Sequence, residues 1–305
     1  MNKQPLVTIA IPAYKKNYIK EAIDSALNQD YKNIEVIIVN DKSPYNLKDI
    51  IDQYEDNRII YYENERNIGK HNPVNNWNRC IELANGDFFT LLCDDDILMP
   101  NFVSELLKLA DKYKKCNVFH ARRIIKNEST GETYEDELWP EWENAIDIYK
   151  NKRWHTISEF LYRTERVKEC KYIPLPMAWG ADDISIINFA AEGGMVSSKD
   201  CLAMFRFNDE HISKEDTHMV EKAKARIEEA IWFSNFFTQV PYHPDYINHL
   251  DILMIEFIRR VNYIDKFRIL LHVPNQVWSW KHKCAIALHI LKGEYTHPGY
   301  RYPGC

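Results

Sequence analysis

Residues 87–96 read Asp87-Phe88-Phe89-Thr90-Leu91-Leu92-Cys93-Asp94-Asp95-Asp96, a short apolar run that ends in three consecutive aspartates. The turn pair Asn85-Gly86 precedes the run. The short length and aromatic content of the run indicate a buried strand. Three adjacent carboxylates cannot all stay ionised easily unless a cation or strong hydrogen-bond donors lie among them. The end of a buried strand is also where open α/β sheets bind ligands. We therefore expect a site for Mg²⁺ or Mn²⁺ that carries a substrate phosphate.

A second interpretation of the three aspartates is that they cap the next helix. Residues 97–102 open a helical pattern, with Pro100 as a plausible first-turn residue. One aspartate would be enough for a cap, so the presence of three favours ligand binding.

Strand and helix patterns alternate around this stretch, from residue 5 to about residue 121. β-Branched and apolar runs predict strands at 6–12, 34–39, 58–62, 87–93 and 117–121. Helical spacing predicts helices at 18–27, 47–54, 74–84 and 102–113. This alternation predicts an α/β fold with a mainly parallel, doubly wound sheet.

The rest of the chain is less regular. Residues 122–156 lose periodicity and predict a long functional loop. We predict helices at 157–170 and 184–191, a strand at 202–207, and helices from about 215 onward, with a break at Pro274. We therefore predict an α/β domain at residues 1–213 and a helical extension at 214–305. The α/β domain has two halves, about 1–121 and 122–213.

Composition narrows the classes of function. The 305 residues carry a formal charge of −6, which disfavours a nucleic-acid-binding protein. The seven cysteines show no CxxC pair, which favours reduced thiols and a cytoplasmic location. The apolar run near the N-terminus is too short for a signal peptide, and no run is long enough to span a bilayer.

Five segments in order carry a resemblance to a known family. They are Val7-Thr8-Ile9-Ala10-Ile11-Pro12-Ala13-Tyr14, the stretch 29–43, Asn67-Ile68-Gly69, Ala84-Asn85-Gly86-Asp87 and Asp94-Asp95-Asp96-Ile97-Leu98-Met99-Pro100. Over roughly residues 5–213 this set resembles the family 2 glycosyltransferases of GT-A fold. The resemblance implies a nucleoside diphosphate sugar donor, with a UDP-sugar favoured, a divalent metal (Mn²⁺ or Mg²⁺), and inversion at the anomeric carbon. It also implies transfer of a hexosyl or N-acetylhexosaminyl group to a glycan or lipid-linked glycan in bacterial surface-polysaccharide synthesis.

The resemblance assigns donor and metal binding to the first half of the α/β domain. The matching donor-binding residues are Pro12, Ala13, Tyr14, Asp41, Asn67, Gly69, Lys70, Asp94 and Asp95. Tyr14 is expected to stack on the donor base and Asp41 to contact it, while Arg66 and Lys70 are candidates for phosphate contacts. Asp95 and Asp96 are the expected metal ligands, although Cys93 stands where the first aspartate of the family motif is often found. The alternatives are ordinary packing for Tyr14, a helix cap or Asx turn for Asp41, and simple solvation for the two loop cations.

The second half carries the expected catalytic residues. Asp182-Asp183 matches an acidic pair at the start of a helix, and we assign Asp183 as the general base that takes the proton of the acceptor hydroxyl. Trp179 is a candidate floor for an acceptor ring, and Arg206 a candidate ligand of donor phosphate. The alternatives are a helix N-cap for the acidic pair, core packing for Trp179 and a structural salt bridge for Arg206.

Two other functions are weighed against transfer. A sugar nucleotidyltransferase would normally carry a Gly-rich phosphate loop after the first strand, and residues 12–16 contain no glycine. A non-catalytic sugar-binding or assembly protein on a transferase scaffold stays open until activity is tested.

The C-terminal tail mixes aromatic and cationic residues beside the apolar stretch 285–291. This pattern suits weak peripheral attachment to the inner face of the cell membrane, where a lipid-linked acceptor would wait. The alternative is packing of amphipathic helices on the α/β domain or on a second subunit of a homo-oligomer.

Overall fold

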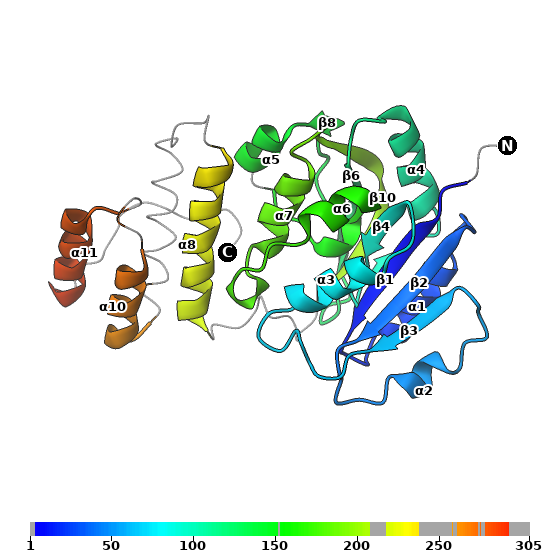
Figure 1. Ribbon diagram of the computed structural model, residues 1–305, viewed down its shortest axis with the longest axis horizontal. Helices are drawn as coiled ribbons and strands as arrows, with labels where there is room; N and C mark the ends of the chain where they lie inside the picture. Colours follow the sequence, from blue (N-terminus) through cyan, green and yellow to red (C-terminus); the bar gives the residue numbers. More distant parts are fainter. Residues whose placement is uncertain are drawn as a thin grey trace. The chain divides into compact units, whose positions relative to one another are not determined.

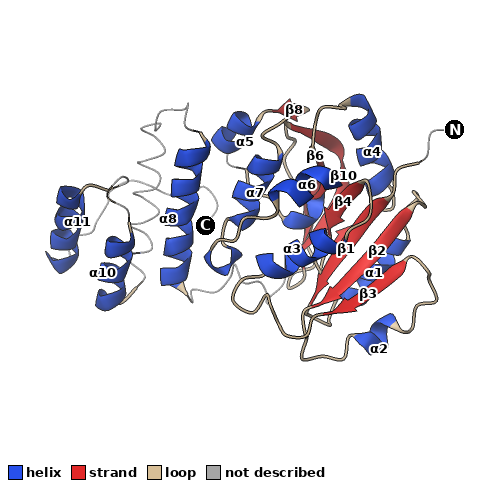
Figure 2. Cartoon of the chain, in the orientation of Figure 1, coloured by secondary structure: helices blue, strands red, loops and turns tan. Residues whose placement is uncertain are grey.

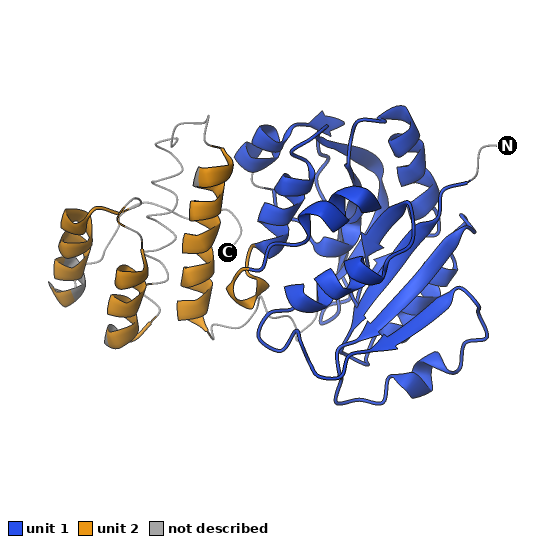
Figure 3. Ribbon diagram, viewed as in Figure 1, with its two compact units in different colours: residues 1–174, 181–214 blue, residues 175–180, 215–305 orange. Residues whose placement is uncertain are grey.

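The computed structural model describes residues 4–151, 153–207, 218–237, 258, 261–273, 275 and 278–292. The chain divides into two compact units (Figure 3). Unit 1 comprises residues 1–174 and 181–214, and unit 2 comprises residues 175–180 and 215–305. Unit 1 ends at residue 214, one residue after the expected domain boundary at 213. The short segment 175–180 belongs to unit 2.

Unit 1 is built on a mixed sheet of ten strands among the described residues, in the order β3-β2-β1-β4-β9-β6-β10-β5, with β7 beside β6 and β8 beside β10 (Figure 2). The first four strands of this order are parallel: β3 (Ile59–Glu63), β2 (Ile34–Asn40), β1 (Val7–Ala13) and β4 (Phe88–Leu91). The remaining strands are β9 (Phe160–Arg163), β6 (Val118–Asn127), β10 (Met195–Phe207), β5 (Ile97–Leu98), β7 (Thr133–Glu135) and β8 (Trp142–Glu143). β9 runs antiparallel to both β4 and β6, whereas β10 runs parallel to β6.

Helices cover both faces of the sheet, which explains why β1 and β2 are apolar along almost their whole length. The odd-numbered residues of β1 pack in one core cluster with α1 (Ile19–Leu27) and α4 (Phe102–Lys112). The opposite face is covered by α3 (Val74–Leu83) and α6 (Thr164–Cys170). In Figure 1, α3 and α6 lie in front of the sheet and α1 lies behind it.

About half of the predicted loop at 122–156 forms regular elements. β6 extends to Asn127, and β7, β8 and α5 (Ala145–Asn151) follow it. The predicted helix at 157–170 is wrong in its first half, which contains the short 3₁₀ helix η1 (Ile157–Glu159) and strand β9. The residues of β9 are buried on both faces, so this strand shows no alternation that would separate it from a helix.

The three aspartates do not cap the following helix. Ile97 and Leu98 form β5, which pairs with β10, and α4 begins only at Phe102 after Asn101. The capping interpretation is therefore wrong. The predicted helix at 47–54 is also shorter than expected, because α2 spans only Lys48–Ile51.

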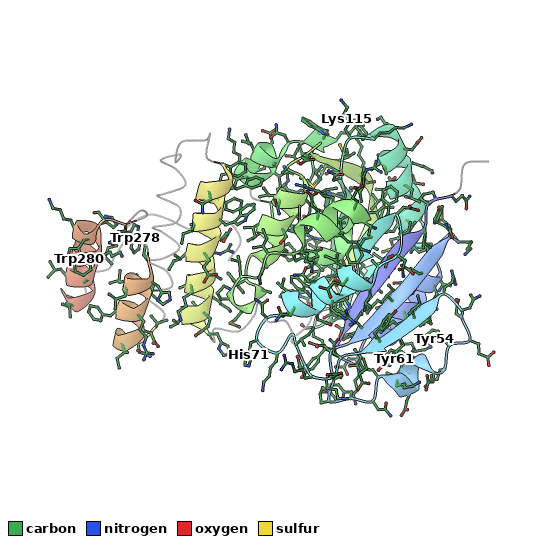
Figure 4. All side chains as sticks on the ribbon, viewed as in Figure 1. Tyr54, Tyr61, His71, Lys115, Trp278 and Trp280 are labelled. Carbon is green, nitrogen blue, oxygen red and sulfur yellow. The ribbon has the colours of Figure 1, made fainter. Side chains whose placement is uncertain are left out.

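Unit 2 is helical. It contains η2 (Pro176–Ala178), α8 (Met219–Phe236), α10 (Tyr263–His272) and α11 (Trp280–Lys292). α8, α10 and α11 share an apolar cluster that includes Trp278, whereas Trp280 is 63% exposed; Figure 4 labels both tryptophans. Pro274 and the predicted helical pattern over 245–257 lie outside the described residues.

Among the described residues, no helix is long and apolar enough to cross a membrane. Attachment of the tail to a membrane surface and self-association through its helices stay predictions.

Candidate active site

The parallel strands β1, β2 and β4 bring the predicted donor and metal residues to one edge of the sheet. Tyr14 and Lys15 follow β1, Asp41 follows β2, and the segment 93–96 follows β4. Parallel neighbours end at the same edge, so segments far apart in sequence meet there. Asp41, Asp94, Asp95 and Asp96 are each at most 6% exposed, and such acids need partners.

Asp94 fastens two of these segments together. Its Oδ2 accepts hydrogen bonds from the backbone N–H of Tyr14 at 2.8 Å and of Lys15 at 2.7 Å. Burial, with the charge of Asp95, raises the pKa of Asp94 to about 6, although these two bonds act in the opposite direction. The structure therefore gives Asp94 a positioning role, and its contact with the donor stays a prediction.

Asp95, Asp96 and Cys93 together form a candidate metal site. One carboxylate oxygen of each aspartate and the Cys93 sulfur lie within 4.8 Å of one another. Ser158 donates its hydroxyl to Asp96 Oδ2 at 2.6 Å, and the backbone N–H of Arg206 donates to Asp96 Oδ1 at 3.1 Å. These bonds fix the orientation of one ligand while each oxygen keeps a lone pair for a cation. The donor set fits a divalent cation, and metal binding by Asp95 and Asp96 stays a prediction.

Burial gives Asp96 a pH-dependent effect on stability. Desolvation, with the charge of Asp95, raises the pKa of Asp96 to about 7. The folded state therefore holds this proton more tightly than the unfolded state. The stabilisation is complete below about pH 4 and is lost as the pH rises through about 7.

We expect metal-free protein to lose stability relative to Asp96→Asn as the pH rises from 5 to 8, by about 1–3 kcal/mol. Urea unfolding of both proteins in EDTA, at matched pH values, measures this difference. Mn²⁺ should restore the stability of the unsubstituted protein at pH 8 and leave the variant unchanged. A stability difference that is constant with pH would contradict the assignment.

Asp41 holds the loop that follows β3. Its Oδ1 accepts from Asn64 Nδ2 and from the backbone N–H of Ile68, each at 2.8 Å, and its Oδ2 accepts from the backbone N–H of Gly69 at 2.7 Å. The helix-cap interpretation is wrong, because these bonds engage the carboxylate. A carboxylate has about four acceptor sites, so about one remains for a donor base. The predicted base contact stays a prediction.

The glycine of the Asn67-Ile68-Gly69 motif allows this close approach. A Cβ atom at Gly69 would lie 2.6 Å from Asp41 Oδ2. We expect Gly69→Ala to lower the free energy of unfolding by about 1–3 kcal/mol, because the loop must move and leave a buried carboxylate short of donors. Chemical denaturation measures the effect, with Lys70→Ala at the exposed neighbouring position as control. Equal stability of the two variants would contradict this role of Gly69.

The other predicted donor residues differ in accessibility. Tyr14 is 43% exposed and so has an accessible ring face, while Pro12 is half-buried and Ala13 is buried. Asn67 is half-buried, and Arg66 and Lys70 lie on the same loop. Their contacts with a donor stay predictions.

Asp182 and Asp183 lie in the first turn of α7 (Ala181–Phe189), where a helix favours negative charge. Burial, with the charge of Asp183, raises the pKa of Asp182 to about 6. The Asp183 side chain is 38% exposed, and its Oδ1 lies 3.3 Å from His155 Nε2. Asp183 is thus accessible and contacts a second titratable group.

His155 is held so that it faces Asp183. Its Nδ1 lies 3.2 Å from the Arg153 carbonyl oxygen, which can only accept, so Nδ1 carries a proton. Its Nε2 lies 3.3 Å from Asp183 Oδ1, so the ring stands directly beside the carboxylate.

Aromatic rings hold His155 in place. Trp139 and Phe160 meet its ring edge-on, with centroids at 6.4 Å and 5.6 Å. Trp139 in turn stacks on His120, with centroids 3.7 Å apart. Close to them, Arg123 makes a fully buried ion pair with Glu159 at 2.5 Å. The segment predicted as a loop thus contributes Trp139 and His155 to the packed rings beside Asp183.

Arg206 has the structural salt bridges that its alternative interpretation predicted, whereas Trp179 is half-buried and contacts a lysine. Arg206 is 2% exposed, pairs with Glu21 at 2.5 Å and with Glu128, and donates from Nε to the backbone oxygen of Asp95. Within unit 2, the ammonium of Lys222 lies 4.4 Å from the centre of the Trp179 ring. Binding of phosphate by Arg206 and of acceptor by Trp179 stay predictions.

Three site residues escaped the sequence analysis: Lys15, His155 and Ser158. Lys15 donates from Nζ to Asp95 Oδ2 at 2.8 Å. A lysine directly after the first strand, at the edge where the aspartates gather, was the one available signal. His155 and Ser158 lie in the region whose strands were predicted as loop and helix.

Comparison with known proteins identifies the family. The model of "Glycosyl transferase family 2" matches residues 8–171, more than half of the 305 residues. The chain belongs to glycosyltransferase family 2. One relative in this family is the GalNAc(5)-diNAcBac-PP-undecaprenol beta-1,3-glucosyltransferase of Campylobacter jejuni, 33% identical over 111 residues, which are 35% of each chain. This chain matches about a third of the length of that relative and of the first curated relatives.

Solved structures confirm the predicted GT-A fold of this family 2 member and its C-terminal helical region. TarS of S. aureus in complex with UDP-GlcNAc has a TM-score of 0.65 at 16% identity, over 96% of this chain and 93% of that chain. The mannosyltransferase PcManGT of Pyrobaculum calidifontis, in complex with GDP-Man and Mn²⁺, has a TM-score of 0.53 at 15% identity, over 97% and 82%. At these identities the likeness concerns the fold.

Proposed function

We propose that this protein transfers a sugar from a nucleoside diphosphate sugar, with a UDP-sugar favoured, to a hydroxyl group of a glycan or lipid-linked glycan. One observation carries the proposal: a single edge of the sheet holds Tyr14, Asp41 and the cluster of Cys93, Asp95 and Asp96. An accessible carboxylate, Asp183, lies on α7. These are the groups that donor binding and proton removal require.

Asp95 and Asp96, with Cys93 beside them, would hold the divalent cation. When bound, that cation supplies positive charge that neutralises the leaving diphosphate. The carboxylate oxygens of Asp95 and Asp96 suit Mn²⁺ or Mg²⁺. Ser158 and the Arg206 backbone keep Asp96 oriented toward the site, and the exposed face of Tyr14 is available to the donor base.

Asp183 is the proposed general base. Its carboxylate takes the proton of the acceptor hydroxyl as that oxygen attacks the anomeric carbon, and a single displacement inverts that centre. His155 Nε2 lies 3.3 Å from Oδ1 of this proposed base. Asp182, whose pKa burial raises to about 6, is the alternative base in the same turn of α7.

The comparisons support the choice of substrates. TarS was solved with UDP-GlcNAc and PcManGT with GDP-Man and Mn²⁺, and the relative from Campylobacter jejuni is named for a lipid-linked glycan. The deciding experiment is thermal-shift and hydrolysis screening with UDP-, GDP-, dTDP- and CMP-sugars in the presence of Mn²⁺. We expect one nucleotide class to stabilise the protein only with metal. Absence of any metal-dependent response across the four classes would contradict the proposal.

A further inference from the structure

Lys15 places a positive charge on the carboxylate that we assign to the metal. Its Nζ donates to Asp95 Oδ2 at 2.8 Å, and its backbone N–H donates to Asp94. The Asp95 side chain is 6% exposed, so this ion pair lies largely out of water. Asp95 belongs to the cluster whose ligand atoms lie within 4.8 Å of one another.

A second cationic side chain near Asp95, that of Arg206, pairs with two glutamates. Arg206 forms ion pairs with Glu21 and Glu128, and its Nε donates a hydrogen bond to the backbone oxygen of Asp95. Lys15 therefore adds a positive charge beside the Asp95 carboxylate. An ammonium and a divalent cation on the same carboxylate repel each other, so the two compete.

We propose that Lys15 is an internal counter-ion of the metal site, which leaves Asp95 when the cation binds and then neutralises the diphosphate of the donor. This inference rests on the proposed function of the site. The lysine is suited to such a move because its side chain is 30% exposed and its ammonium is a point charge on a flexible stem. Its anchored backbone keeps the ammonium close to the site in both positions.

The proposal predicts effects of opposite sign from one substitution. Lys15→Met keeps much of the length of the side chain and removes its charge. It should tighten binding of Mn²⁺ alone by about tenfold, because the competing cation is gone. It should weaken binding of inorganic pyrophosphate in saturating Mn²⁺ by a similar factor of about ten, because a phosphate partner is gone.

The experiment uses the full chain stripped with EDTA, with free Mn²⁺ followed by electron paramagnetic resonance and pyrophosphate binding followed by calorimetry. Lys15→Arg should bind both probes as the unsubstituted protein does. Lys16→Met is the matched control, because the Lys16 ammonium lies over the Tyr45 ring at 4.8 Å rather than on the acids of the cluster. Circular dichroism confirms that each variant is folded.

The outcomes separate this inference from the proposed function. If Asp95→Asn loses Mn²⁺ but Lys15→Met binds it no more tightly than the unsubstituted protein, Lys15 is not a competitor and the inference is overturned. If Lys15→Met and Lys15→Arg bind pyrophosphate equally, its second half is overturned. If Asp95→Asn binds Mn²⁺ unchanged, the metal site itself is wrong, and the proposed function falls with it.

Discussion

Asp95→Ala is expected to abolish sugar transfer, with a loss of about 10³-fold or more, because the cation that it holds stabilises the leaving diphosphate by several kcal/mol. Asp95 is 4% exposed and lies in the cluster with Cys93 and Asp96. The variant should also lose the Mn²⁺-dependent part of donor binding, which calorimetry with and without metal measures. The remaining affinity should come from contacts with the nucleotide.

A control variant separates loss of the site from loss of the fold. Asp52→Ala removes an exposed carboxylate that pairs with Lys48 on α2, away from the cluster. It should transfer sugar as the unsubstituted protein does. Unchanged turnover in a folded Asp95→Ala variant would contradict the assignment of Asp95 as a metal ligand.

Asp183→Asn is expected to keep donor affinity while turnover falls by about 10²-fold or more, the usual contribution of a general base. The amide has nearly the same shape but cannot take the acceptor proton. Its Oδ1 still faces His155, so the packing of the rings beside it is retained. The measurement is kcat at saturating donor, together with the dissociation constant of the donor.

Asp182→Asn is the matched comparison, since it changes the neighbouring carboxyl in the same turn of α7. A larger loss in this variant would show that the order of the pair is reversed. Detectable transfer by the unsubstituted protein at the start of this series also decides against a binding-only protein on a transferase scaffold.

The parallel part of the sheet could be predicted from sequence because its strands are covered on both faces. Buried runs such as Val7–Ala13 and Ile34–Asn40 are apolar at nearly every position, and helices with clear spacing follow them. The aspartates after β4 could be predicted as a site because folding alone does not require three acids at the end of a buried strand. Their burial has a large electrostatic cost unless a ligand or hydrogen-bond donors offset it.

The second half of unit 1 could not be predicted in the same way. β9 is a four-residue strand buried on both faces, and a short apolar run fits a helix or a strand equally. It is placed by pairing with β4 and β6, whose residues lie far away in the chain. His155 and Ser158 could not be recognised as site residues until these pairings put them beside Asp183 and Asp96.

The sequence by itself determined the family, the strand ends that carry the donor and metal residues, and the choice of Asp183 as the proposed base. These depend on residue types at short spacings, which periodicity and motif order reveal. Only the tertiary structure decided what holds each acid in place. Asp94 fastens β1 to β4, Asp41 holds the loop at Gly69, and Lys15 lies on Asp95, because hydrogen bonds and charges act across segments that are distant in sequence and adjacent in space.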